Sequence, residues 1–291
     1  MGKISTSVVK TSFSIDKIAN YKLSILCGID SLSYCIRDQS NTVLILKQFD
    51  LFTDISGENE ARFLDKLGEV WTKESMLALP FPDVHIAFVH PHFTLVPNKL
   101  YQSDKKAVYL DAVRDKPSIP YSFYSNSLPS IAATLVFNVP QFAIDFFESK
   151  YKHPHYYNSV NSLVNKIAHK RKNQTDKQVW LNIYPSRLQI ALFEGPILLF
   201  ANQFEFQSEN DFLYYVLLVY NQFKLAVEKT PLLISGQLVK QSAIYKKLYR
   251  YIRNLSFVSV SDTYQLTTHL TEKPPYFFFD LLSVGENIDR S

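Results

Sequence analysis

Residues 23–38 read LSILCGIDSLSYCIRD, and residues 179–195 read VWLNIYPSRLQIALFEG. In each stretch an apolar strand, Leu23–Cys27 or Val179–Ile183, is followed by a tight turn and a second apolar strand. Leu23 corresponds to Val179, so the two stretches are offset by 156 residues. A pattern that returns at a fixed offset indicates an internal repeat. The apolar runs alternate only partly with polar residues, which indicates strands that are covered on both faces.

The elements that follow each stretch keep the same order. In the first half we expect strands at Thr42–Lys47, Val84–Val89, Phe93–Pro97 and Ala133–Val139, and helices at Glu58–Glu74 and from about Pro140. In the second half we expect strands at Ile197–Ala201, Leu232–Ser235 and Phe257–Val260, and helices after the capping residue Ser208 and at Val239–Arg253. The shared order β-β-β-α-β-α-β predicts a mixed sheet with helices on both faces in each half.

The stretch between the repeats, Lys170–Lys177, is polar and contains no apolar residue. A chain of 291 residues is long enough for two domains, each with a buried core. We therefore predict an α/β protein of two tandem domains, residues 1–172 and 173–291.

A duplicated unit of this order resembles the actin, Hsp70 and sugar-kinase group, whose halves are ribonuclease-H-like. The chain also resembles DUF3822, an uncharacterised bacterial family found in Bacteroidetes. The segments that carry this resemblance lie roughly between Tyr21 and Leu282; they are LSILCGIDSLSYCIRD, FTLVPNKLY, ATLVFNVP, LNIYPSRLQIALFEG and PPYFFFDLL. The resemblance implies two ribonuclease-H-like (actin-like ATPase) domains with a nucleotide cleft between them.

Actin-like ATPases hold phosphate on Gly-rich hairpins, in which an Asp orients hydrated Mg²⁺ and backbone N–H groups face phosphate oxygens. This chain has only 7 Gly. Its first hairpin has one Gly, Gly28, and the acidic residue Asp30 follows this Gly instead of preceding it, next to Ser31. The first phosphate loop therefore departs from the family pattern.

The second hairpin, Tyr184–Arg187, has neither Gly nor carboxylate, and Pro185 removes a backbone donor. We expect Arg187 to be a surface residue. In the Gly-Gly turn that flanks adenosine in the family, only Gly236 remains, preceded by Ser235. We interpret Gly28, Asp30, Ser31, Ser235 and Gly236 as vestigial positions of a nucleotide site, and we expect no catalytic residue, metal or cofactor.

Other candidate chemistry is sparse. His90-Pro91-His92 and His153-Pro154-His155 place imidazoles close together, but we interpret them as loop histidines because no local acidic or Cys ligand completes a metal site. We expect Cys27 and Cys35 to be buried free thiols.

The net charge is +4, and one basic cluster, Lys166–Lys172, is interpreted as a solvated helix end. The apolar tail Pro274–Leu282 is expected to pack on the core as a last helix, or else to dock another protein. The first residues carry no apolar stretch long enough for a secretory signal, so we expect a cytoplasmic protein.

Three functions follow from these observations. The first is a non-catalytic actin-like scaffold that binds another protein. The alternatives are an ATP-binding or ATP-hydrolysing enzyme with a non-standard phosphate site, in which Asp30 and Asp38 approach Mg²⁺, and a nucleic-acid-associated accessory protein that uses Lys166–Lys172.

Overall fold

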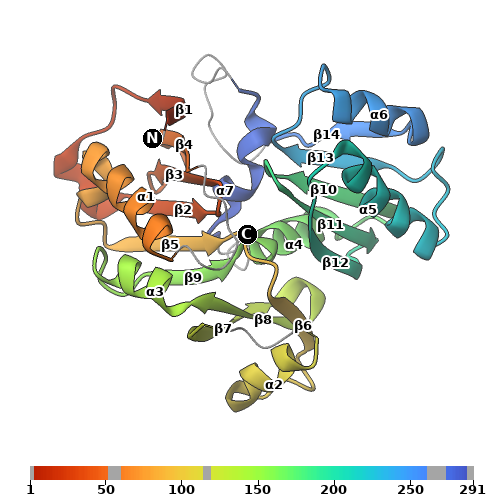
Figure 1. The fold of residues 1–291 in the computed structure, drawn as a ribbon, viewed down its shortest axis with the longest axis horizontal. Coiled ribbons are helices and arrows are strands. Elements are labelled where there is room, and N and C mark those ends of the chain that lie inside the picture. Colours follow the sequence, from red (N-terminus) through yellow and green to blue (C-terminus); the bar gives the residue numbers. More distant parts are fainter. Residues whose placement is uncertain (1–2, 52–59, 114–118, 261–272, 287–291) are drawn as a thin grey trace.

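The computed structural model describes residues 3–51, 60–113, 119–260 and 273–286. Two mixed sheets lie side by side, and a third, smaller sheet adjoins the first (Figure 1). The first sheet has the order β1-β4-β3-β2-β5-β9 and the second has the order β12-β11-β10-β13-β14. The strands of the first are β1 (Lys3–Val9), β2 (Lys22–Cys27), β3 (Ser31–Arg37), β4 (Val43–Asp50), β5 (Asp83–Phe88) and β9 (His155–Asn158). Those of the second are β10 (Lys177–Ile183), β11 (Arg187–Glu194), β12 (Ile197–Glu205), β13 (Leu232–Gly236) and β14 (Leu255–Phe257).

The two sheets repeat one topology. In the first, β2 pairs antiparallel with β3 and parallel with β5. In the second, β10 pairs antiparallel with β11 and parallel with β13. Except for the extra edge strand β1, the strands of each half take the same places, so the predicted duplication and the α/β fold class are confirmed.

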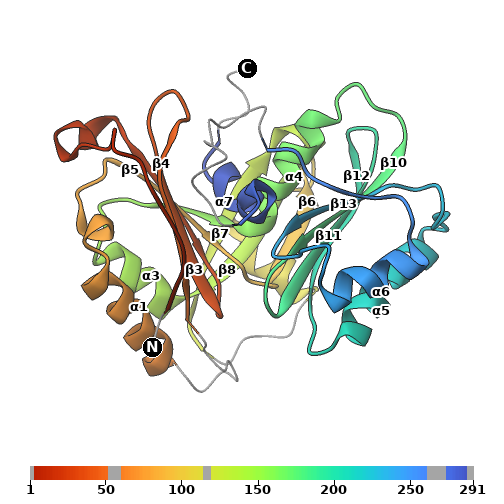
Figure 2. The ribbon, with the colours of Figure 1, turned by 90° about the horizontal axis from the view of Figure 1, so that it is seen from above.

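Helices cover both faces of each sheet, as predicted. Figure 2 shows helices on the outer face of each sheet and further helices between the two sheets. The outer helices are α1 (Glu60–Lys73) and α3 (Gln141–Glu148) on the first sheet, and α5 (Glu209–Gln222) and α6 (Ala243–Tyr251) on the second. The inner helices are α4 (Ser159–Lys170) and α7 (Phe279–Ser283). Residues 58–59 of the first predicted helix lie outside the described residues.

Local sequence explains where these helices begin and which face they bury. Ser208 and Asp211 form a capping box at the start of α5, as the sequence predicted. Helix α1 buries Leu67, Val70 and Trp71, which lie three and four residues apart and so share one face. Pro140 precedes α3, where a missing N–H costs no helical hydrogen bond.

The third sheet is a feature that the sequence predicted only in part. It has the order β6-β8-β7, with β6 (Phe93–Pro97), β7 (Tyr121–Leu128) and β8 (Ala133–Pro140). The expected strand at Ala133–Val139 is therefore present, but it lies outside the main sheet. In the first sheet, β9 takes the edge position that β14 takes in the second sheet. Strand β9 begins at His155, so the interpretation of His155 as a loop residue was wrong. The remaining short helices are η1 (Ile15–Asn20), η2 (Ser75–Ala78), η3 (Ser103–Lys105), α2 (Lys106–Asp111), η4 (Pro129–Ile131) and η5 (Pro275–Phe278).

The C-terminal tail packs inside the molecule, as expected for a last helix. Buried tail residues join the large hydrophobic cluster that also contains the first sheet; they are Phe278, Phe279, Leu281, Leu282 and Val284. The buried Arg37 guanidinium fixes this segment, since it donates hydrogen bonds to the carbonyls of Leu282 (2.7 Å) and Val284 (2.9 Å). The tail of the predicted second domain is thus part of the core of the first half.

Candidate functional site

The tips of the two duplicated hairpins touch each other. Asp30 lies at the turn between β2 and β3, and Ser186 lies at the turn between β10 and β11. The Ser186 hydroxyl donates a hydrogen bond of 2.9 Å to Asp30 Oδ2. These two residues are 156 positions apart, which is the offset of the repeat, so they are equivalent positions of the two halves. The resemblance to actin-like ATPases would place a bound phosphate in the space between these two hairpins.

The groups of the first hairpin bond to one another. The Gly28 N–H donates to the Ser31 carbonyl at 2.8 Å, and the Ser31 hydroxyl donates to Asp30 Oδ1 at 3.3 Å. Leu51 N–H donates to the Asp30 carbonyl at 2.8 Å. The Gly28 amide is therefore used to close the turn, and both Asp30 carboxylate oxygens accept from serine hydroxyls.

The second hairpin is built around a buried arginine, and the expectation that Arg187 is a surface residue was wrong. Arg187 is 6% exposed. Its Nε donates to Glu205 Oε1 at 3.0 Å, and its Nη1 donates to the Val89 carbonyl at 3.2 Å. Arg187 and Glu205 lie opposite each other in the antiparallel pair β11 and β12. The pairing of these two strands could therefore have predicted Glu205 as the partner of Arg187. The guanidinium charge is compensated within the protein.

The two remaining candidate positions lie at the end of β13. The Ser235 hydroxyl donates to Asn182 Oδ1 at 2.8 Å, on the neighbouring strand β10. Gly236 has φ +82, and a Cβ atom on it would lie 2.2 Å from the Ile183 carbonyl oxygen. Backbone packing alone therefore requires glycine at this position.

Little space is left between the hairpins and the segment that follows Gly236. The pocket there, whose lining includes Ser31, Tyr184, Gln237, Phe278 and Asp280, has a volume of about 10 Å³. Ligand pockets commonly measure roughly 300 to 1,000 Å³. The structure thus brings Ser31 and Gln237, the residue after β13, to the same small pocket, and tail residues such as Phe278 and Asp280 also line it.

Asp280 places a buried carboxylate in this region. Its Oδ2 accepts a hydrogen bond of 3.1 Å from Asn182 Nδ2, and its Oδ1 accepts one of 2.8 Å from the Leu281 N–H. Burial raises the pKa of Asp280 above its ordinary value. When ionised, this carboxylate would repel a phosphate group.

The predicted approach of Asp30 and Asp38 to one Mg²⁺ does not occur. The two residues flank β3 at its opposite ends, and a strand of seven residues spans roughly 20 Å or more. Asp38 Oδ1 instead accepts hydrogen bonds from the N–H groups of Ser40 and Thr42, which shapes the turn before β4. Within the described residues, no group of three or more His, Cys, Asp or Glu side chains could hold a metal ion.

The basic cluster is a helix end, as predicted, but it is not simply solvated. Lys166 is buried and its Nζ lies 2.7 Å from Glu286 Oε2. Arg171 is also buried; its Nε donates to the Gly195 carbonyl at 2.9 Å, and its Nη2 lies 2.9 Å from Asp176 Oδ1. Two of the cationic groups thus connect α4 to other segments of this chain.

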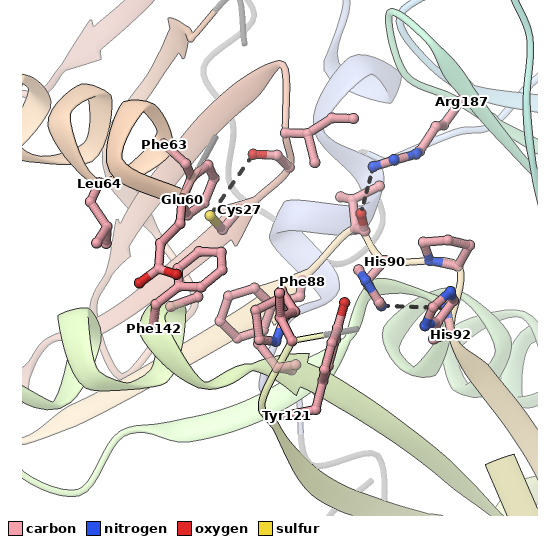
Figure 3. Close-up of a pocket in the computed structure, with 18 of the residues that line it drawn as sticks. Cys27, Glu60, Phe63, Leu64, Phe88, His90, His92, Tyr121, Phe142 and Arg187 are labelled. Carbon is pink, nitrogen blue, oxygen red and sulfur yellow. Dashed lines mark hydrogen bonds between the residues drawn. The ribbon is translucent and has the colours of Figure 1, made fainter. Parts of the chain in front are cut away.

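A much larger pocket lies beside the first hairpin. It has a volume of about 750 Å³ and shares no lining residue with the small pocket (Figure 3). Helices α1 and α3, the hairpin and the connection between β5 and β6 line it, together with Tyr121 of β7. Its aromatic side chains are Phe63, Phe88, Tyr121 and Phe142. No local motif marks this pocket, because its residues come from elements that are far apart in the sequence.

The polar groups of the large pocket are few. Glu60, Glu205 and Arg187 carry the charges, and the His90 and His92 rings lie with centroids 4.7 Å apart. Cys27 also lines the pocket, and burial raises the pKa of its thiol to about 12, which keeps it protonated. Cys27 and Cys35 are both buried free thiols, as predicted.

A second polar cluster, which sequence reasoning missed, joins β5 to β9. His85 Nε2 lies 2.6 Å from Asp83 Oδ1, and His85 Nδ1 lies 3.1 Å from the Tyr157 hydroxyl. The ring packs so closely on the tail that a Cβ atom on Gly285 would lie 2.4 Å from it. Burial lowers the pKa of His85 to about 4, so the ring is neutral near pH 7.

The fold is similar to that of many solved structures. A protein of actin-like ATPase fold and unknown function from Bacteroides thetaiotaomicron is 21% identical, with a TM-score of 0.75 over 84% of this chain and 93% of that one. A PilM–PilN complex of type IV pilus biogenesis is 12% identical, with a TM-score of 0.60 over 90% of this chain and 97% of the matched chain. No curated protein matches the sequence.

None of the helices in the described ranges is long and apolar enough to cross a membrane.

The sequence profile of DUF3822, a family described as proteins of unknown function, matches residues 10–255. This match covers most of the chain, and the structural similarity agrees with it. The chain therefore belongs to the DUF3822 family and has the actin-like ATPase fold.

Proposed function

We propose that this protein is a non-catalytic scaffold of actin-like fold that acts by binding another protein. The observation that carries the proposal is the direct hydrogen bond between Asp30 and Ser186, which joins the two hairpins where a nucleotide phosphate would have to enter. A closed junction of this kind favours a rigid pair of domains over a cleft that opens and closes around ATP.

The chemistry of the junction supports the same conclusion. Phosphate binding needs free backbone N–H groups and positive charge. The Gly28 N–H is bonded within its turn, and Pro185 has none to offer. The nearby cation, Arg187, is paired with Glu205, while Asp30 adds negative charge at the junction. Each of these features disfavours an anionic ligand.

The comparison with PilM gives an example of a similar fold in a complex with another protein. PilM is solved in a complex with PilN, so one actin-like protein holds a protein partner. At 12% identity the likeness supports the fold alone, and the proposal for this chain rests on the closed junction.

Affinity capture from cells that make the protein tests the proposal. A tagged chain should recover a specific partner, and the amount recovered should not change when ATP and Mg²⁺ are added. An ATPase assay on the purified chain provides the complementary test. Hydrolysis above the buffer rate that is lost in Asp30→Ala would overturn the proposal, as would a partner bound only in the presence of ATP.

A further inference from the structure

The large pocket beside the first hairpin is a candidate docking site for a partner. We infer that the 750 Å³ pocket between α1, α3 and the β2–β3 hairpin binds a short peptide segment that carries large apolar side chains and a basic residue. This inference rests on the proposed scaffold function and identifies where, and with what chemistry, the partner would bind.

The shape and lining of the pocket fit large apolar side chains. Its volume lies within the range of roughly 300 to 1,000 Å³ that is usual for ligand sites. Phe63 and Leu64 from α1 line the pocket together with Phe142 from α3, and the Phe63 and Phe142 rings pack edge to face with centroids 5.9 Å apart (Figure 3). All three are only partly buried by the rest of the chain. A ligand that covers them removes apolar surface from water, which favours binding.

The charged residues that line the pocket favour a ligand with a positive charge. Glu60 and Glu205 contribute two negative charges against the single positive charge of Arg187, so the charged lining residues sum to −1. Arg187 is already paired with Glu205, whereas Glu60 makes no hydrogen bond or ion pair with any residue in the described ranges. Figure 3 shows the Glu60 carboxylate beside the aromatic lining. A Lys or Arg side chain of the ligand would pair with it there.

The same charges argue against other occupants. A fatty acid or a nucleotide would bring its own anionic group toward Glu60 and Glu205, with no uncompensated cation among the lining residues to receive it. A peptide meets both requirements, since it can offer apolar side chains for the aromatic lining and a cationic side chain for Glu60.

Selection from a display library of random heptapeptides tests the inference on the full chain. Enriched sequences should combine two or three of Leu, Ile and Phe with a Lys or Arg. For a selected peptide, fluorescence polarisation should give a Kd that rises at least about tenfold with Glu60→Lys and with Phe142→Ala. Changing the basic residue of the peptide to Glu should restore binding to the Glu60→Lys variant. Tyr214→Ala, at an exposed position of α5, is the matched control and should leave the Kd unchanged.

The outcomes separate this inference from the proposed function. Enrichment of acidic peptides, no enrichment, an acyl chain retained in native mass spectrometry, or a Kd that Glu60→Lys does not change would each overturn the docking site. If affinity capture recovers a partner equally well with wild type, Glu60→Lys and Phe142→Ala, the scaffold function stands and the docking site is refuted. Self-association that Phe142→Ala abolishes would assign the pocket to a second copy of the chain, which also contradicts the inference.

Discussion

Replacing Gly236 by Ala tests whether this glycine is kept for packing. The residue has φ +82, a conformation that L side chains rarely adopt. An added Cβ would lie 2.2 Å from the Ile183 carbonyl oxygen and 2.5 Å from the Ile183 nitrogen. Both atoms belong to the backbone of β10, which cannot move without disturbing its pairing with β11 and β13.

The size of the effect follows from two contributions. Placing Ala in the left-handed region costs about 1–2 kcal/mol. Forcing a methyl group against packed backbone costs about 1–3 kcal/mol more. We therefore expect Gly236→Ala to lower the free energy of unfolding by about 2–5 kcal/mol.

Gly68 offers a matched control within the same chain. It lies inside α1, and a Cβ atom there would meet nothing within 4 Å. Gly68→Ala should raise the free energy of unfolding by about 0.5–1 kcal/mol, because Ala loses less backbone entropy than Gly in a helix. Urea unfolding followed by circular dichroism measures both variants. A Gly236→Ala protein as stable as wild type would refute the packing explanation.

Three further perturbations test other parts of the structure. Arg37→Met should lower stability by about 2–4 kcal/mol and speed proteolysis of the tail, because two buried carbonyls lose a charged donor; unchanged proteolysis would contradict this. Asp30→Ala and Ser186→Ala should each cost about 0.5–1.5 kcal/mol, and the double variant should cost less than their sum, whereas strict additivity would show that the hairpins do not interact. The pKa of His85 is about 4 when folded and about 6.5 when unfolded, so the unfolded chain binds the proton first as pH falls. The contribution of His85 to stability should therefore be constant above about pH 6.5 and should fall by about 3 kcal/mol between about pH 6.5 and pH 4. His85→Gln should flatten this part of the curve, and an unchanged pH profile would rule out the ring as its cause.

Much of the fold was predictable because its signals are local or periodic. The strands that frame each repeat are apolar runs, and Ser208 marks the start of its helix through a cap that needs only a few residues. Strand β9, with the sequence HYYN, carries no such pattern. It becomes a strand because it pairs with β5, which is a tertiary effect.

The site was predictable only as a set of departures from a family pattern. The sequence indicated that Gly28 and Asp30 are in the wrong order for a phosphate loop, but the bond from Asp30 to Ser186 depends on how the two halves pack. The large pocket was even harder to predict from the sequence, since residues from both ends of the first half and from the second half meet there. Contacts over such sequence distances leave no local signature.

Titration of ATP and Mg²⁺ into the purified chain by calorimetry tests the central claim most directly. With the Asp30–Ser186 junction closed and about 10 Å³ beside it, no heat beyond dilution is predicted at millimolar nucleotide. Saturable binding of one nucleotide per chain that Asp30→Ala abolishes would contradict the account.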